Sequence, residues 1–419
     1  MSKFVESELG PLLDMIIDYR GKTPKKLHGD WVSSGIPALS AKNIKHGKIV
    51  NPESIRFVNS ELYARWMKEE VKRGDILMTS EAPLGETFYV KNDDKILLSQ
   101  RLFAIRTKDN KLVSRFLYYY FNSPFGKHEL LSRATGTTVG GIRQTALVKV
   151  MVRMPESIST QRQISSVLSA YDDLIENNEK RIKALEEMAQ LLYTEWFVKF
   201  KFPGHEKVKM VDSGTEYGKI PQGWAFVEMR SVAKIIDCLH TKKPDAIKTG
   251  NKILLQLNNI LDNGMISLAE KYLISDTDYE KWTANIELRD GDCVVTNVGR
   301  IAASAQIANG VVAAAGRNMT VIRPEKIPAS FLIQYLHSRH MVKEVSKKTD
   351  AGAIMGSLNV KNIYLLKVLL PDRATLESFG SLAHGIRAEM NKLNQQNYVL
   401  SQIRDLLIPQ LVTGKRELK

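Results

Sequence analysis

The chain has 419 residues, of which 43% are apolar, so it can bury more than one hydrophobic core. Its formal net charge of +14 favours an acidic partner, either nucleic acid or an anionic membrane surface. No signal peptide and no run of eighteen apolar residues is found, which argues against a membrane role. The two cysteines form no metal-spaced pair, so we expect a reduced, cytoplasmic protein.

Residues 1–155 are predicted to form one compact domain of mixed strands and helices. Strand-like runs at residues 75–78 and 102–105 alternate with turn residues, and a helix is expected at residues 114–121.

A long helix is predicted for residues 156–204, because neither proline nor glycine occurs between Pro155 and Pro203. Its apolar positions form the two seven-residue rows of a coiled coil, with Asn178 as a polar interruption. The rows are Ile164, Tyr171, Asn178, Leu185 and Leu192, and Leu168, Ile175, Ile182, Ala189 and Trp196. Such a seam needs a second helix to cover it.

A polar linker at residues 205–218, a second mixed domain at 219–371 and a second long helix at 372–419 complete the chain. The second helix again carries two rows of seam positions, with Phe379, Ile386, Leu393, Leu400 and Leu407 in one row. The other row is Leu376, Ala383, Met390, Asn397, Arg404 and Leu411. Gly380 and Gly385 leave the predicted start of this helix open.

The second half of the chain repeats the first. Landmarks recur at offsets of 215 to 217 residues, among them Tyr63 and Tyr279, Trp66 and Trp282, Gly74-Asp75 and Gly291-Asp292, Arg101 and Arg317, and Ser123 and Ser338. We therefore predict an α+β fold: two similar mixed α/β domains, joined and separated by two long antiparallel coiled-coil helices, with an internal pseudo-two-fold repeat.

No catalytic motif stands out. The sequence has no P-loop, no G-x-G-x-x-G and no H-E-x-x-H, and we expect no metal site and no cofactor. Residues 122–125, Asn-Ser-Pro-Phe, resemble the Asn-Pro-Pro-Phe motif of amino methyltransferases, but the middle residue differs and the repeat at Ser338 does not keep it. We interpret this segment as a helix stop.

Basic and amide side chains at matched places indicate contacts with nucleic acid. Lys22, Lys25 and Lys26 lie around Pro24, and Lys242 and Lys243 lie beside Pro244. Either phosphate binding or an ordinary solvated loop explains them. Gln100-Arg101 and Arg317-Asn318 are suited to reading base edges, although a buried structural arginine is an equal alternative. The glycine-rich residues 136–141 can approach a phosphate, but their repeat keeps the glycines and loses the hydroxyls, which favours backbone geometry.

Four segments resemble the DNA-specificity subunits of type I restriction–modification systems. Residues 171–178 read Tyr-Asp-Asp-Leu-Ile-Glu-Asn-Asn, 191–198 read Leu-Leu-Tyr-Thr-Glu-Trp-Phe-Val, 202–206 read Phe-Pro-Gly-His-Glu, and 218–224 read Gly-Lys-Ile-Pro-Gln-Gly-Trp. The first three are similar to the central conserved segment of that family, and the fourth resembles its usual entry into the second target-recognition domain.

The resemblance implies a subunit without catalytic activity. In such a subunit each target-recognition domain reads one half of a bipartite, asymmetric site in double-stranded DNA. The helices would set the spacing and dock two modification subunits, with restriction subunits joining through the complex.

The residues of this chain that we predict to contact DNA are Lys22, Lys25, Lys26, Gln100, Arg101, Thr137, Thr138, Arg143, Lys242, Lys243, Arg300, Arg317 and Asn318. The implied subunit-contact residues are Asp172, Asp173, Glu176, Glu179, Trp196 and Phe197.

Two other classes of protein remain open. A methyltransferase fused into one chain needs a cofactor loop and an Asn-Pro-Pro-Tyr-type motif, and neither is present. A structural spacer that joins two protein partners would use the helices but would not select DNA.

Overall fold

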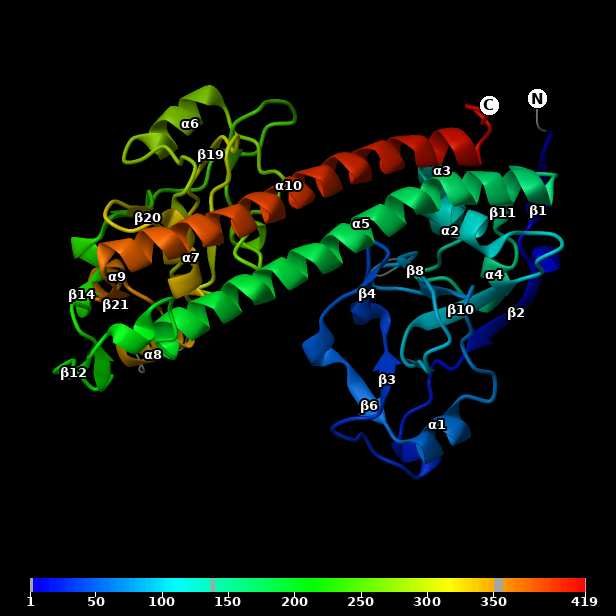
Figure 1. The fold of residues 1–419 in the computed structure, drawn as a ribbon. Coiled ribbons are helices and arrows are strands. Elements are labelled where there is room, and N and C mark those ends of the chain that lie inside the picture. Colours follow the sequence, from blue (N-terminus) through cyan, green and yellow to red (C-terminus); the bar gives the residue numbers. More distant parts are fainter. Residues whose placement is uncertain (1–2, 137–139, 350–356, 419) are drawn as a thin grey trace. The chain divides into compact units, whose positions relative to one another are not determined.

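The computed structural model describes residues 3–136, 140–349 and 357–418 and divides into two compact units. Unit 1 consists of Met1–Leu174 with Leu400–Lys419, and unit 2 is Ile175–Val399. Both units mix strands and helices, and both include parts of two long helices, α5 (Ile158–Tyr193) and α10 (Arg373–Val412) (Figure 1). The predicted α+β fold with two long helices is therefore confirmed. In the part of the chain that the structure describes, no helix combines the length and the apolar character needed to cross a membrane.

Unit 1 is built around a four-stranded sheet in the order β2-β10-β7-β8. Smaller sheets pair β1 with β11, place β3 between β6 and β9, and join β4 to β5. Its elements before α5 are β1 (Phe4–Glu8), β2 (Leu13–Asp18), β3 (Ile36–Leu39), β4 (Ile44–Lys45), β5 (Lys48–Ile49), β6 (Arg56–Val58), α1 (Ser60–Trp66), β7 (Ile76–Thr79), β8 (Thr87–Tyr89), β9 (Leu97–Leu98), β10 (Leu102–Thr107), α2 (Ser114–Asn122), α3 (Pro124–Ser132), α4 (Gln144–Leu147) and β11 (Met151–Pro155).

The central strands of this sheet are buried on both faces. Side chains on a strand alternate between faces, so Ile76 and Met78 of β7 join one core while Leu77 joins another. The first core contains Phe116 of α2, and the second contains Trp66 of α1. The predicted strands at 75–78 and 102–105 and the helix at 114–121 correspond to β7, β10 and α2.

Unit 2 repeats this topology. Its four-stranded sheet has the order β15-β20-β17-β18, and β14 pairs with β21 as β1 pairs with β11. Its elements before α10 are β12 (Met210–Asp212), β13 (Lys219–Pro221), β14 (Ala225–Glu228), β15 (Ala233–Asp237), β16 (Ile253–Leu254), α6 (Asp276–Thr283), β17 (Cys293–Thr296), β18 (Ser304–Gln306), β19 (Ala313–Ala314), β20 (Met319–Pro324), α7 (Ala329–Leu336), α8 (Arg339–Lys348), α9 (Val360–Tyr364) and β21 (Lys367–Leu370).

Matching hydrogen bonds show the repeat in detail. Ser123 Oγ donates to the Tyr120 carbonyl and caps α3, and Ser338 Oγ donates to the Tyr335 carbonyl and caps α8, each Oγ–O distance being 2.6 Å. Residues 122–125 are thus a helix end followed by a new helix, as interpreted from the sequence.

One predicted equivalence is wrong. Ser80 N donates to the Arg101 carbonyl, and Asn297 N donates to the Asn318 carbonyl in the same place. Both Arg101 and Asn318 have positive φ angles, of 65° and 63°. Arg101 therefore corresponds to Asn318, and Gln100 corresponds to Arg317, because one residue more separates the repeats here than the residue types suggested.

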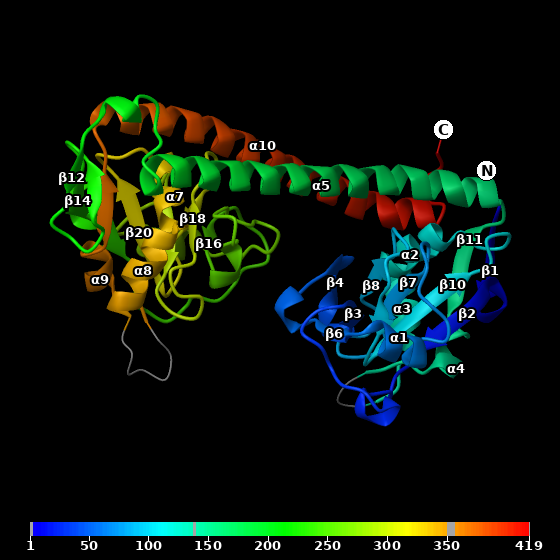
Figure 2. The same cartoon turned by 60° about the horizontal axis from the view of Figure 1, so that its bottom comes forward.

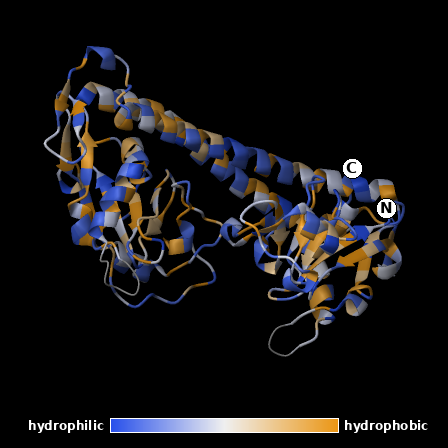
Figure 3. Cartoon of the chain, turned by 90° about the horizontal axis from the view of Figure 1, so that it is seen from below, coloured by the Kyte–Doolittle hydropathy of each residue, from blue (hydrophilic) through white to orange (hydrophobic). Residues whose placement is uncertain are grey.

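The two long helices pack against each other in antiparallel order within each unit (Figures 1 and 2). In unit 1, Ile164 and Leu168 of α5 share a core with Ile408 and Leu411 of α10. In unit 2, Ile182 joins Met390 and Leu393, while Tyr193 and Trp196 contact Phe379. Hydrophobic residues recur between hydrophilic ones along both helices (Figure 3). The predicted seam is confirmed at Leu168, Ile175 and Ile182, which are all buried.

The ends of the helices differ from the prediction. The α-helical part of α5 stops at Tyr193 and continues as a π turn, Thr194–Val198, which directs Trp196 and Phe197 into the core of unit 2. Gly380 does not interrupt α10 but allows a close approach, because a Cβ atom there would lie 2.6 Å from Pro328. Its carbonyl also accepts a hydrogen bond from Ser330 Oγ at 2.9 Å.

A buried amide pair fixes the register of the helices in unit 2. Asn178 Nδ2 donates to Asn397 Oδ1 at 2.9 Å, and Asn397 Nδ2 donates to the Ile175 carbonyl at 3.4 Å. Both side chains are at most 9% exposed, so a shift of either helix would leave buried amides without partners. The polar interruption noted at Asn178 therefore has a partner in the polar position of the other helix.

We expect Asn178→Leu to destabilise the full chain by about 1–3 kcal/mol, because it leaves the buried Asn397 Oδ1 without its donor. The double variant Asn178→Leu/Asn397→Leu should recover most of that loss, since both amides are then gone. Urea unfolding measures these changes, with Asn177→Leu on the exposed side of α5 as the control. A double variant that is less stable than the single one would contradict the register role.

Candidate nucleic-acid interface

An open surface depression of about 510 Å³ in unit 1 is lined by two of the predicted DNA-binding residues, Gln100 and Arg101. It is lined by Asp18, Arg20, Gly21, Glu81, Gln100 and Arg101. Gln100 and Arg101 lie immediately before β10, and the left-handed backbone of Arg101 turns the chain there. Non-glycine residues adopt this conformation at a cost of about 1–2 kcal/mol, so its recurrence at Asn318 marks a position held by its surroundings.

Arg101 makes an exposed ion pair. Its Nε lies 3.1 Å from Glu81 Oε1, with the two side chains 53% and 41% exposed. Surface pairs of this kind contribute at most about 1 kcal/mol, so a phosphate or a base edge can compete for the guanidinium. Arg101 is thus not the buried structural arginine that the sequence left as an alternative.

The three lysines of the first loop have different environments. Lys22 is half-buried, donates from Nζ to the Trp66 carbonyl at 2.7 Å and lies over the Tyr19 ring. Burial, and then the charge of Lys68, lower the pKa of Lys22. Lys25 and Lys26 are exposed on the short helical turn Lys25–Leu27, and Lys26 Nζ donates to the carbonyl of Gly21 at the depression. Lys25 and Lys26 are therefore more exposed than Lys22, which holds its loop in place.

The glycine-rich loop begins and ends beside the same depression. Thr137 and Thr138 lie outside the described residues. At the base of the loop, Thr135 and Gly141 exchange backbone hydrogen bonds, and Gly141 also forms a bridge to Glu81. Arg143, two residues further on, is exposed at the start of α4.

In unit 2 the residues before β20 take the matching place. Arg317 is exposed, and Asn318 is half-buried with the positive φ angle described above. The Asn297 side chain, at the position equivalent to Ser80, donates to Thr320 Oγ1 and to the Leu358 carbonyl. The two units thus present different side chains, glutamine in one and arginine in the other, from the same backbone position.

The remaining predicted residues of unit 2 are partly engaged within the protein. Lys243 lies over the Tyr272 ring at 3.5 Å, and burial lowers its pKa, while Lys242 is exposed. The Arg300 guanidinium donates to the Ile260 carbonyl at 2.5 Å and pairs with Asp262. The hydrogen bond to the Ile260 carbonyl holds the Arg300 guanidinium against its own unit, which makes Arg300 a weaker candidate for DNA contact than Lys242 or Arg317.

The sequence analysis missed a buried ion pair that occurs in both units. Arg106 reaches Asp75 at 2.8 Å, and Arg323 reaches Asp292 at 2.7 Å, with each carboxylate only 1% exposed. The hydrogen bond to its aspartate raises the pKa of each arginine. The repeated Gly-Asp landmark marked the acids, but their partners lie 31 residues further on, beyond any local pattern.

Of the predicted subunit-contact acids, Asp172 is engaged inside unit 1 and does not face a partner. It accepts a hydrogen bond from Tyr119 Oη at 2.5 Å and pairs with Arg404 at 2.7 Å, so it ties α5 to α2 and α10 inside unit 1. Asp173 lies 3.3 Å from Lys91 and 3.5 Å from Arg115, but it is 57% exposed. Glu176 pairs with Lys180 one turn along the helix, and Glu179 is exposed.

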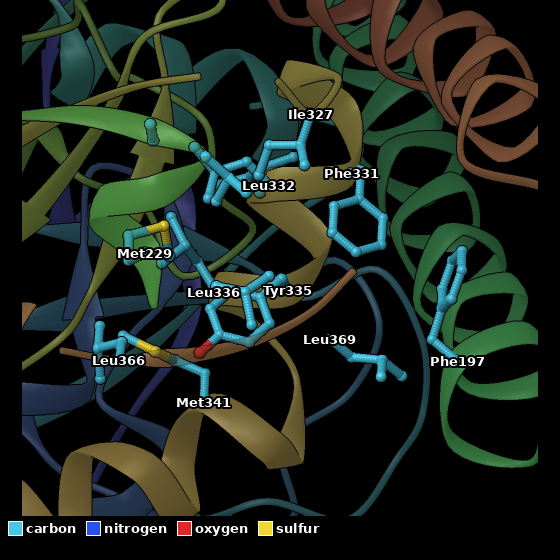
Figure 4. Close-up of a cluster of buried hydrophobic side chains, with 14 of the residues drawn as sticks. Phe197, Met229, Ile327, Phe331, Leu332, Tyr335, Leu336, Met341, Leu366 and Leu369 are labelled. Carbon is cyan, nitrogen blue, oxygen red and sulfur yellow. The ribbon is translucent and has the colours of Figure 1, made fainter. Parts of the chain in front are cut away.

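Trp196 and Phe197 are core residues of unit 2 and are not available as a surface. They are 6% and 4% exposed. Figure 4 shows Phe197 beside Phe331 of α7, and the ring centroids lie 5.0 Å apart in an edge-to-face arrangement. The resemblance of residues 191–198 implied a partner contact, but these two side chains are buried in the core of unit 2.

Other apolar residues of the long helices remain exposed. Leu191 of α5 and Leu406 of α10, which are 215 residues apart and hence equivalent in the repeat, are 63% and 66% exposed. Each is an uncovered large apolar side chain at the same position of its repeat.

Comparison with known proteins shows what this chain is similar to. Residues 1–187 match the family described as type I restriction modification DNA specificity domain. The MjaIX specificity subunit of Methanocaldococcus jannaschii is 24% identical over 94% of this chain and 90% of its own length. The chain is similar to type I restriction enzyme specificity subunits over nearly its whole length.

Other comparisons agree with this relationship. The HindI specificity subunit of Haemophilus influenzae is 21% identical over 83% of this chain and 88% of its own length. The crystal structure of a type I S subunit from M. genitalium superposes with a TM-score of 0.58 at 13% identity, covering 98% of this chain and 96% of that one. This likeness shows a shared fold.

Replacing the buried Arg106 and replacing the exposed Arg101 should change the stability of the chain by different amounts. We expect Arg106→Met to destabilise the chain by about 3–5 kcal/mol, because it leaves the carboxylate of Asp75 buried without its partner. Arg101→Met should change stability by no more than about 1 kcal/mol, because its ion pair is exposed. Chemical denaturation of both variants checks this, and equal losses would contradict the two assigned roles.

Proposed function

We propose that the chain is the DNA-specificity subunit of a type I restriction–modification complex and that it has no catalytic activity of its own. The observation that carries this proposal is the repeated fold with different polar side chains at one position, Gln100 in unit 1 and Arg317 in unit 2. We propose that residues 1–155 and 219–371 are the two target-recognition domains, each of which reads one half of a bipartite site.

The chemistry of these side chains suits base recognition in the major groove. Arginine pairs best with the two acceptors of guanine, and glutamine or asparagine pairs with the donor and acceptor of adenine. Gln100 and Arg101 in unit 1, and Arg317 and Asn318 in unit 2, are therefore the proposed base readers. Exposed lysines nearby, Lys25, Lys26 and Lys242, are proposed to bind phosphates, where a mobile point charge suffices.

We further propose that the long helices dock the modification subunits. The exposed leucines at equivalent positions, Leu191 and Leu406, give each repeat the same apolar contact, which supports two equivalent docking sites. Restriction subunits would join through this complex. The relatives are named as specificity subunits, which supports this assignment over a spacer that joins proteins without selecting DNA.

Each half-site should depend on its own unit. We expect Gln100→Ala to relax base preference in one half of the target and Arg317→Ala to relax it in the other half. Each loss should be about 1–3 kcal/mol at one base pair, because one side chain reads it. Selection of a randomised DNA library by the chain assembled with modification subunits measures both preferences.

Lys149→Ala, an exposed change at the end of α4, is the matched control for that selection. A variant that relaxes both half-sites equally, or neither, would show that these positions do not read bases in separate domains.

Each of the two proposed docking sites should bind one modification subunit independently of the other. Leu191→Glu and Leu406→Glu, each made alone, should reduce the complex from two modification subunits to one, because a carboxylate in an apolar contact is desolvated without a partner. The double variant should bind none, while the chain itself stays folded. Native mass spectrometry gives the stoichiometry and circular dichroism the folding, with Glu187→Ala as an exposed control on α5. Full occupancy in the double variant would place the contact elsewhere.

A further inference from the structure

Three side chains with metal-binding chemistry converge at the end of β15 in unit 2. Asp237 is the last residue of the strand, Cys238 follows it, and His240 lies two residues further on. One carboxylate oxygen, the thiol sulfur and one imidazole nitrogen of these residues all lie within 4.8 Å of one another. We propose that Asp237, Cys238 and His240 form a binding site for a divalent transition metal of the zinc class.

The donor set selects the metal. Thiolate and imidazole are favoured by zinc and its neighbours in the transition series, whereas magnesium and calcium prefer oxygen ligands alone. Zinc sites commonly use three protein ligands from these residue types and leave a fourth position to water. The His240 and Asp237 side chains are 66% and 40% exposed, so solvent reaches the fourth position.

The surroundings contain oxygen atoms that lack partners. Asp237 Oδ2 lies 2.9 Å from His240 Nε2, but Asp237 Oδ1 is buried and makes no hydrogen bond among the described residues. Thr241 Oγ1, next to His240 in the sequence, is also buried without a partner there. A buried carboxylate oxygen without a donor is costly, and a bound cation removes that cost.

In unit 1 an arginine side chain neutralises the equivalent aspartate. Asp18 ends β2 and lies opposite Phe103, as Asp237 ends β15 and lies opposite Thr320, so the two aspartates are equivalent. Arg20 binds Asp18 through two hydrogen bonds of 2.9 and 2.7 Å. In unit 2 the residue two positions after the aspartate is Leu239, and the thiol and imidazole of its neighbours take the place of the guanidinium.

The site has a clear structural consequence. Cys238 N donates to the Met319 carbonyl at 3.2 Å, so the site adjoins the start of β20 and the preceding Arg317 and Asn318. The loop that carries Lys242 and Lys243 begins directly after His240. A bound metal replaces the thiol proton of Cys238, which passes to solvent, and fastens this loop to the strand end.

Cobalt(II) titration of the full chain, purified metal-free, tests the site. One equivalent of cobalt should produce the near-ultraviolet charge-transfer absorption of a cobalt–thiolate bond, and zinc should abolish it by displacing the cobalt. Cys238→Ser should eliminate the band. His240→Gln and Asp237→Asn should weaken binding by at least about tenfold, since even partners outside the ligand set contribute about that much. His384→Gln, an exposed histidine of α10, is the matched control and should bind as the unchanged chain does.

A second measurement covers variants that alter folding. Zinc in excess should raise the melting temperature of the unchanged chain and leave that of Cys238→Ser where it is, because only a ligand that binds the folded state stabilises it. The proposal is overturned if the unchanged chain gives no cobalt–thiolate band, or if the band persists in Cys238→Ser and so arises from Cys293. It is overturned equally if zinc stabilises both proteins to the same extent.

Discussion

Each unit completes its hydrophobic core with the end of a helix that belongs to the other repeat. In unit 2, Tyr193, Trp196 and Phe197 from the end of α5 pack against Phe331 and Phe379, with ring centroids 4.8 to 6.1 Å apart. In unit 1, Ile408, Leu411 and Val412 from the end of α10 enter the core that contains Phe116. The start of one helix and the end of the other are therefore parts of the same buried cluster, which ties the heptad pattern to the mixed domains.

This arrangement explains why the two units differ at their loops but not in their scaffold. The Asp–Arg pairs, the serine caps and the sheet order are the same in both, and all of them are buried or internal. The side chains before β10 and β20 are free to vary because they contribute little to the core. A scaffold of this kind allows the side chains before β10 and β20 to change without a loss of stability.

The sequence predicted those features of the fold that produce periodic patterns. Heptad spacing located the seam, and repeated landmarks located the two mixed domains, because both depend on positions a fixed number of residues apart. It could not reveal pairs that form only on folding, such as Arg106 with Asp75, or Asp172 with Arg404. The sequence also aligned Arg101 with Arg317 because the two residues are of the same type. In the structure the backbone position of Arg101 is equivalent to that of Asn318. Phe197 was misplaced for a local reason, since a π turn moves side chains off the face that a regular helix predicts. The burial of Trp196 agrees instead with its place in the predicted seam.

The division of unit 1 into two separate stretches has a consequence for biosynthesis. Unit 2 is one continuous stretch, Ile175–Val399, whereas unit 1 needs Leu400–Lys419, which the ribosome makes after all of unit 2. The first domain to be translated is thus the last to complete its hydrophobic core. Its core lacks Ile408 and Leu411 until the end of translation, when all residues of the second domain have already been made. A premature stop codon at residue 400 would therefore leave unit 2 complete and damage the amino-terminal domain, although that domain lies farthest from the lesion along the message.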